Sequence, residues 1–266
     1  MSRFARSWLA LREPYDHAAR SKALADRFGR ALGQAPRLID LGCGAGANLR
    51  YLGPRLPPAQ HWLCLDRDRD LLVEADAVLG DWRRTTGWQG SVRLEACDLA
   101  ASLDLLTHHD ALTASALLDL TSAAWLDRLA ERCRGTPLLM ALSFDGRLVW
   151  EPGLAEDDVI LARFLAHQGT DKGFGPALGP DAAAHLMGRL EAIGHRVTSA
   201  KSDWRLGPAD QPLLEAMLDG VIAAVAEIEQ GNRLDLWADQ RRRQLAGGEL
   251  GLTVGHVDLL ALPPRP

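Results

Sequence analysis

Three glycines, each separated by one residue, are the feature of this sequence that most suggests a binding site. Gly42, Gly44 and Gly46 lie in the stretch RLIDLGCGAG, directly after a short apolar run that ends in Asp40. Glycines that follow a strand permit a tight turn, let the backbone approach a ligand and leave the N–H groups of the next helix facing that ligand. The spacing predicts a nucleotide or nucleoside ligand, although GCGAGA also fits the permissive pattern that binds dinucleotides.

Two further acids follow the glycines where later apolar runs end. Asp66 closes the run HWLCLD about 20 residues after the glycines, where a carboxylate can accept hydrogen bonds from both ribose hydroxyls. Asp98 follows the next run, in ACDL, where its side chain can accept from an exocyclic amine such as that of adenine. Asp is also favoured at helix caps and in turns, so Asp40, Asp66 and Asp98 each have a structural alternative.

The elements expected to position these residues alternate between apolar runs and helical patterns, which is typical of a parallel sheet covered by helices. Strands are expected at 37–40, 61–66, 92–97, 110–115, 137–144 and 195–201, and the closing stretch GLTVGHVDLLALP predicts one more. Helices are expected at 47–56, 68–80, 122–134, 156–167, 181–193, 209–230 and 232–246, with an amphipathic helix before the first strand. The glycines then follow the first strand, at the carboxyl edge where such sheets bind ligands.

Length and composition narrow the class of protein. A chain of 266 residues with 47% hydrophobic and 24% charged residues can bury a full core as one large domain. Lys and Arg number 30 against 35 Asp and Glu, a formal charge of -5 that offers no basic excess for nucleic acid. No window approaches the roughly 18 apolar residues of a membrane span, and the start lacks signal-peptide features, so we expect a cytoplasmic protein. The four cysteines form no CxxC pair, which favours free thiols over a zinc site or disulfides.

The chain resembles the class I S-adenosylmethionine-dependent methyltransferases through IDLGCGAG, WLCLDRD, EACDL and DALTASALLDL, which occur in the right order and spacing. The resemblance covers about 37–144 and the closing strand. It implies an α/β fold: a Rossmann-like, doubly wound, seven-stranded sheet whose last strand is antiparallel, with an N-terminal helical cap and helical insertions before that strand. A single methyltransferase domain over 1–266 is expected, with the cap at 1–34, the cofactor-binding core at 35–145 and acceptor-side elements at 146–266.

The resemblance also implies a set of residues that hold S-adenosyl-L-methionine. Asp40 and the three glycines would line its methionine and ribose portion, Asp66 would take the ribose, Asp98 the adenine amine, and the strand end at Ser115 would lie beside the methyl group. The full cofactor-binding set expected is Arg20, Asp40, Gly42, Gly44, Gly46, Asp66, Arg67, Asp98, Leu99 and Ser115. An acid directly before the glycines suits this positively charged cofactor, whereas it would repel the pyrophosphate of a dinucleotide.

The N-terminal segment offers charged side chains at helical spacing. Arg12, Asp16 and Arg20 recur every four residues and therefore share one side of a helix. One interpretation is a surface ladder of ion pairs. The functional alternative gives Arg20 the carboxylate of the cofactor and gives Arg12 or Tyr15 the methyl acceptor.

A glycine-rich stretch after the fifth strand is the other candidate for acceptor binding. The loop AHQGTDKGFGPALGP is richer in glycines and polar groups than a plain connector requires. We expect the segment 167–179 to be a mobile gate in which Lys172 contacts the acceptor and His167 acts as the base, since the pKa of a free histidine lies nearest neutrality. An ordinary surface loop is the alternative.

The function expected from these features is methyl transfer from S-adenosylmethionine to a small polar or anionic metabolite by in-line displacement, in which orientation matters most and a base is optional. The segment ASALLDLTSAAW lacks the Asn-Pro-Pro-Tyr type of motif found in methyltransferases that act on adenine or glutamine amino groups. We therefore expect a small-molecule partner, with no nucleic acid, membrane or metal involved. A noncatalytic protein that binds S-adenosylmethionine or S-adenosylhomocysteine and an NAD-dependent dehydrogenase are the alternatives, and the methylated atom and oligomeric state stay open.

Overall fold

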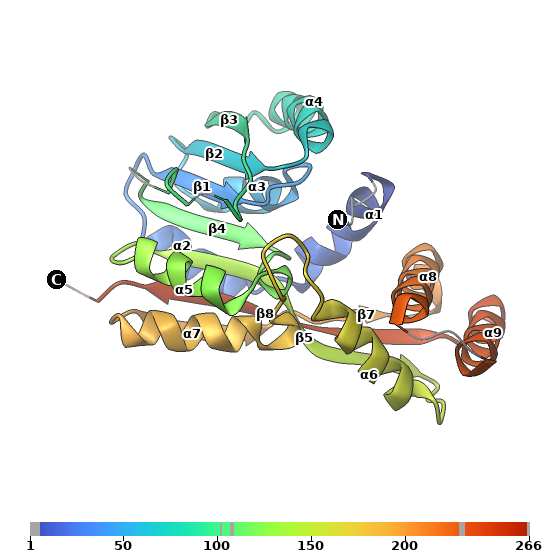
Figure 1. Ribbon diagram of the computed structural model, residues 1–266. Helices are drawn as coiled ribbons and strands as arrows, with labels where there is room; N and C mark the ends of the chain where they lie inside the picture. The colour runs from blue at the N-terminus through green and yellow to red at the C-terminus, as the bar shows by residue number, and fades with distance from the viewer. Residues whose placement is uncertain (1–5, 102, 107–108, 229–231, 265–266) are drawn as a thin grey trace.

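A single mixed sheet lies at the centre of the computed structural model, which describes residues 6–101, 103–106, 109–228 and 232–264. The strand order is β3-β2-β1-β4-β5-β8-β6, with β7 paired to β8 beside that path (Figure 1). The strands are β1 (Arg37–Leu41), β2 (His61–Asp66), β3 (Ser91–Ala96), β4 (Ala111–Ser115), β5 (Leu138–Glu151), β6 (Arg196–Lys201), β7 (Trp204–Leu206) and β8 (Gly251–Leu262). Strands β1 to β5 run parallel, and β8 lies antiparallel between β5 and β6. The predicted Rossmann-like fold with a reversed last strand is confirmed.

Two details of the sheet differ from the prediction. The sheet has eight strands instead of seven, because the short β7 pairs with β8 in a region expected to be an irregular turn. Strand β5 continues to Glu151 instead of ending near residue 144. Register shifts in its pairing with β8 accommodate Gly146, which has a φ of 89°. A strand of three residues and a strand that bends at a glycine leave no clear period-two pattern in the sequence.

The helices cover both faces of the sheet. They are α1 (Arg6–Ala19), α2 (Lys22–Arg30), α3 (Ala47–Leu52), α4 (Arg69–Thr86), α5 (Ala123–Arg132), α6 (Asp157–Gln168), α7 (Ala182–Ala192), α8 (Gln211–Ile228) and α9 (Asn232–Ala246). One apolar cluster joins α5 and α7 to one face, and a second joins α2, α3 and α4 to the other (Figure 1). The end of the helix predicted at 209–230 lies outside the described residues. The N-terminal segment forms two helices instead of one, because Ser21 caps α2 by accepting a hydrogen bond from the N–H of Leu24.

A third apolar cluster lies beyond the parallel strands, where β5 and β8 extend together. Trp150 of β5, Trp204 of β7 and Trp237 of α9 are buried there with residues of α6 and α8. Figure 1 shows α6, α8 and α9 gathered around these long strand ends. This extension belongs to the part of the chain predicted to serve the acceptor, which, like the single-domain organisation, stays a prediction.

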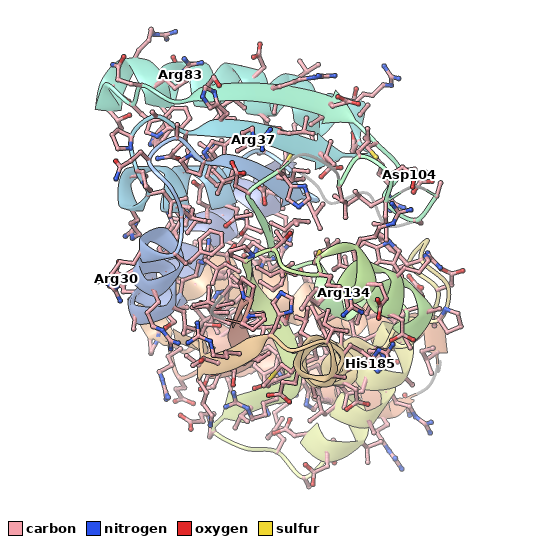
Figure 2. All side chains as sticks on the ribbon, turned by 90° about the vertical axis from the view of Figure 1, so that its left-hand side faces the viewer. Arg30, Arg37, Arg83, Asp104, Arg134 and His185 are labelled. Carbon is pink, nitrogen blue, oxygen red and sulfur yellow. The ribbon has the colours of Figure 1, made fainter. Side chains whose placement is uncertain are left out.

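Figure 2 views the molecule from the side on which the parallel strands begin, with Arg37 at the start of β1. Charged side chains of both signs reach outward there. Arg37 pairs with Asp110 at 3.1 Å and Arg134 with Glu131 at 2.8 Å. Such exposed pairs contribute little to stability. Within the part of the chain that the structure describes, no helix has the length and apolar character needed to cross a membrane.

Candidate functional site

A cavity of about 780 Å³ lies at the carboxyl ends of β1, β2, β3 and β4, beneath α1. The chain reverses its winding there, because β1 pairs with β2 on one side and with β4 on the other. Ligands of open α/β sheets bind at such a switch point. The predicted site residues that line the cavity are Arg12, Arg20, Gly42, Gly44, Asp66, Arg67, Asp98, Leu99, Ser115 and Lys172. Four others, Asp40, Gly46, Tyr15 and His167, are not part of its wall.

The glycine loop adopts a backbone that requires glycine. Gly42, Gly44 and Gly46 have φ values of 65°, 52° and 81°, in the left-handed region that side chains disfavour. A Cβ on Gly46 would also stand 3.0 Å from a methyl carbon of Leu79 in α4. Gly46 ends the loop as the N-cap of α3, so it shapes the cavity without lining it.

Asp66 holds this loop in place through backbone hydrogen bonds. Its Oδ2 accepts from the N–H of Gly44 at 2.8 Å, and its Oδ1 accepts from the N–H of Asp68 at 2.9 Å. Each carboxylate oxygen has a second lone pair, and the half-buried side chain lines the cavity. Asp66 can therefore accept further hydrogen bonds from a ligand while it fixes the loop.

A buried hydrogen-bond network connects Asp40 with Arg20, the residue that follows α1. The Nδ2 of Asn48 donates to Oδ1 of Asp40 at 2.6 Å and to the hydroxyl of Thr113 at 3.1 Å. The Oδ1 of Asn48 accepts from Nη1 of Arg20 at 2.6 Å. Burial raises the pKa of Asp40 to about 7. Sequence reasoning missed Asn48, whose only signal is an amide in the first turn after the glycines.

Asp40 and Arg20, at the two ends of this hydrogen-bond network, have atoms without hydrogen-bond partners in the described part of the protein. Oδ2 of Asp40 and both Nε and Nη2 of Arg20 are buried without one in the described part of the protein. Arg20 is 4% exposed, lies over the ring of Tyr51 at 4.2 Å and lines the cavity. Buried polar groups are costly when unpaired, so these atoms indicate a place for a charged ligand group.

Asp98 and the end of β4 form another part of the cavity wall. Asp98 is exposed, and its Oδ1 accepts from the N–H of Ala100 at 3.0 Å, so it also caps the turn after β3. Leu99, next to Asp98 in sequence, and Ser115, at the end of β4, also line the cavity. Ala116 has a φ of 52°, which is strained for a residue with a side chain and turns the chain sharply at the cavity.

Helix α1 carries the predicted acceptor residues, but their surroundings differ. Nε and Nη2 of Arg12 donate to the two carboxylate oxygens of Asp16 at 2.9 and 3.2 Å, so the predicted ion pair is present at the cavity wall. The guanidinium also lies 4.9 Å from the ring centroid of Trp204. Tyr15 donates its hydroxyl to Oδ1 of Asp210 at 2.9 Å, outside the cavity wall.

The glycine-rich loop packs over the cavity through two of its residues. Lys172 and Phe174 line the cavity, and Phe174 meets Trp125 edge to face at 5.2 Å. The ammonium of Lys172 donates only to neutral oxygens, the carbonyl of His167 at 3.0 Å and the hydroxyl of Thr170 at 2.8 Å, among its described hydrogen bonds. Burial lowers the pKa of Lys172. His167 itself interacts with Glu227 at 3.1 Å, away from the cavity wall.

The four cysteines are free thiols, and Cys43 and Cys97 lie in the cavity wall. Across the described ranges, no group of three or more His, Cys, Asp and Glu residues is arranged to hold a metal ion. The site therefore consists of the backbone of a glycine loop, carboxylates and buried cations.

Comparisons with known proteins identify the fold. No protein-family model matches the chain, and no curated protein matches its sequence. The chain is similar in structure to a cyclopropane-fatty-acyl-phospholipid synthase-like protein from Lactobacillus casei, with a TM-score of 0.56 and 14% identity over 98% of this chain and 94% of that one. It is also similar to the cyclopropane synthase MmaA2 from Mycobacterium tuberculosis, with a TM-score of 0.51 and 14% identity over 97% and 94% of the two chains. The fold is thus the one found in S-adenosylmethionine-dependent methyltransferases.

Proposed function

We propose that this protein is an S-adenosylmethionine-dependent methyltransferase that acts on a small polar or anionic molecule. The observation that carries the proposal is the cavity itself, which is lined by the glycine loop, by Asp66 and by Arg20, whose Nε and Nη2 lack hydrogen-bond partners in the described structure. The fold supports methyl transfer in general, whereas the acceptor is inferred from the residues on the other side of the cavity.

The unpaired atoms fit the amino-acid portion of the cofactor. Nε and Nη2 of Arg20 present two N–H donors in the fork that suits a carboxylate. Asp40, with a pKa of about 7, is about half ionised at neutral pH, and its negative charge behind the wall next to Asn48 favours an ammonium group nearby. The carboxylate of an amino-acid group would pair with Arg20, and its ammonium would lie near Asp40.

The remaining cofactor residues fit the nucleoside portion. Asp66 offers its free lone pairs to the ribose, with Arg67 next to it, and Asp98 and Leu99 border the position proposed for adenine. The same geometry argues against a dinucleotide, because the N–H of Gly44 already donates to Asp66 and is not free for a pyrophosphate. When bound, S-adenosylmethionine supplies an electrophilic methyl group, which we place beside Ser115.

The acceptor side of the cavity combines apolar walls with a cation. Leu117, Leu120 and Phe174 provide the apolar surface, and Lys172 provides a partly buried ammonium without a carboxylate contact among its described hydrogen bonds. Lys172 would bind an anionic group of the acceptor, while α1 and the loop exclude water from the displacement. Arg12 would contribute its charge to the acceptor only in part, since Asp16 already pairs with it.

Two residues proposed from the sequence have weaker support. Tyr15 is hydrogen-bonded to Asp210, and His167 interacts with Glu227, both outside the cavity wall. A role for Tyr15 in acceptor binding or for His167 as a base would require the loop and α1 to move. Orientation without a dedicated base is the simpler proposal, because in-line methyl transfer depends chiefly on alignment.

Binding measurements test the proposal against its alternatives. Titration calorimetry should detect S-adenosylhomocysteine at micromolar to millimolar concentration and should detect no NAD, since only the former suits Arg20 and Asp40. Transfer of labelled methyl groups from S-adenosylmethionine to small molecules of a cell extract would then separate an enzyme from a noncatalytic binding protein. Tighter binding of NAD than of S-adenosylhomocysteine would contradict the proposal, and transfer to nucleic acid or lipid instead would contradict the acceptor class.

A further inference from the structure

A second group of unpaired polar atoms lies next to the cavity, between α1, the turn Leu118–Leu120 and strands β5, β7 and β8. The atoms are Oδ1 of Asp119, Nδ1 of His256 and Nε1 of Trp204, each buried without a hydrogen-bond partner in the described part of the chain. Buried polar atoms are normally satisfied by protein, ligand or water, so each requires a partner. None of these residues is needed for the proposed nucleoside site.

A chain of contacts joins the three side chains. The carboxyl of Asp119 is hydrogen-bonded to the backbone of Phe144, which is the cross-strand partner of His256. The ring of His256 lies 5.0 Å from that of Trp204, measured between centroids. Arg12 stacks over Trp204 and lines the cavity. None of the three side chains is part of the cavity wall itself; the group lies behind Arg12, between α1 and the middle of β5.

Apolar side chains border this group on the cavity side. Leu117 and Leu120 flank Asp119 in sequence, and both line the cavity, as does Phe174 from the glycine-rich loop. A ligand that reaches the group from the cavity would thus pass an apolar wall before it meets polar atoms.

The protonation states define which ligand group fits. Burial lowers the pKa of His256 to about 3, so its ring is neutral near pH 7. Burial raises the pKa of Asp119 to about 6, which leaves the carboxyl mostly ionised near pH 7, as a hydrogen-bond acceptor. Trp204 Nε1 can only donate. Together these atoms complement a ligand group that both donates and accepts hydrogen bonds.

We propose that Asp119, His256 and Trp204 form the subsite that recognises the methyl acceptor, and that this subsite selects a hydroxyl or amino group attached to an apolar portion of the small polar or anionic acceptor. Calling the ligand a methyl acceptor rests on the proposed methyltransferase function, whereas the binding chemistry follows from the unpaired atoms alone. It places the recognised group behind Leu117 and Leu120, which line the cavity.

Phenol and anisole are suitable probes, because they share a small aromatic body and differ in the hydroxyl that can donate. The indole N–H signal of Trp204 in a nitrogen-15 correlation spectrum, assigned with the Trp204→Phe variant, reports on the subsite directly. We expect phenol to shift this signal in a saturable manner and anisole to bind at least about tenfold more weakly, since it leaves the acceptors unpaired. Equal shifts by phenol and anisole, or no shift by phenol at concentrations up to its solubility, would overturn the assignment.

Variants test the individual residues. Asp119→Asn keeps the size of the side chain and should weaken phenol binding at least about tenfold, the lower end of the loss expected for a hydrogen bond to a charged group. His256→Phe keeps the ring packing against Trp204 and Phe144 and should also weaken phenol, so it decides the matter if the first variant does not fold. Asp235→Asn, at an exposed position in α9, should leave phenol binding unchanged. Wild-type affinity for phenol in both site variants would overturn the proposal.

Failure of the subsite can be told apart from failure of the proposed function. S-Adenosylhomocysteine binding by calorimetry reports on the nucleoside site, and the indole signal of Trp204 reports on the subsite. Binding of S-adenosylhomocysteine without selective phenol binding would refute the subsite alone. Selective phenol binding without any affinity for S-adenosylhomocysteine would support the subsite and refute the methyltransferase.

Discussion

Replacement of Arg20 by methionine should weaken binding of the amino-acid portion of the proposed cofactor and leave binding of its nucleoside portion unchanged. Arg20 is buried, and its Nε and Nη2 lack partners in the described structure, so a carboxylate placed there would form two charge-assisted hydrogen bonds. One hydrogen bond to a charged group contributes about 1.5 to 3 kcal/mol, so the loss of the pair should weaken S-adenosylhomocysteine by at least the roughly 10- to 150-fold of a single such bond. Methionine retains an unbranched apolar stem against Tyr51, whose ring lies 4.2 Å from the guanidinium.

The matched ligand for this variant is 5′-methylthioadenosine, which has the nucleoside but no amino-acid carboxylate. Its affinity, measured by titration calorimetry on the same preparations, should change by less than about twofold, a difference within 0.5 kcal/mol. A melting curve of the ligand-free variant checks that it is folded. Equal losses for both ligands would refute the carboxylate assignment and give Arg20 a purely structural role, and an unchanged affinity for S-adenosylhomocysteine would remove Arg20 from the site.

Three further perturbations test other parts of the reasoning. Asp66→Ala should weaken S-adenosylhomocysteine and 5′-methylthioadenosine alike by roughly 1 to 3 kcal/mol in calorimetry, because it removes the ribose acceptor and the hydrogen bond to Gly44; selective loss of only one ligand would contradict this. Burial raises the pKa of Asp40 to about 7. The folded protein therefore keeps a proton on Asp40 that the unfolded chain releases at lower pH, and the free energy of unfolding that this proton contributes is lost as pH rises through about 7. The melting temperature of the wild type should therefore fall relative to Asp40→Asn between about pH 5 and 8, and parallel profiles would count against the buried acid. Lys172→Ala should reduce turnover with an anionic acceptor, while the affinity for S-adenosylhomocysteine stays within about twofold. Lys201→Ala, at an exposed position in β6, serves as the control. Unchanged turnover in Lys172→Ala would remove Lys172 from acceptor binding.

The sequence predicted the proposed cofactor half of the cavity because the signals for that half are local. Gly42, Gly44 and Gly46 each occupy a left-handed backbone conformation, and Asp66 closes the next strand beside them. These positions are fixed by a strand, a turn and a short helix, whose signals lie within neighbouring residues. The alternation of apolar runs and helical patterns likewise predicted an α/β fold, and the reversed last strand was implied by the resemblance to the class I S-adenosylmethionine-dependent methyltransferases.

Some details were beyond local patterns even in this half. Asn48 connects Arg20 to Asp40 because α1 folds back over the glycine loop, a contact between segments 28 residues apart. Nothing in the residues around Asn48 distinguishes it from an ordinary helix position. Only the tertiary structure shows that its amide is buried and shared between a cation and an acid.

The acceptor half was decided almost entirely by tertiary packing. The sequence favoured His167 and Tyr15 for their chemistry, yet their partners, Glu227 and Asp210, lie in distant segments and draw both side chains away from the cavity wall. Asp119 and His256, by contrast, carry no local motif. They are connected because Asp119 is hydrogen-bonded to the backbone of Phe144, which pairs with His256 across the antiparallel strands β5 and β8. Residue types and spacing thus predicted the glycine loop and the succession of strands and helices along the chain, whereas burial and pairing across the chain decided which polar groups were left without partners.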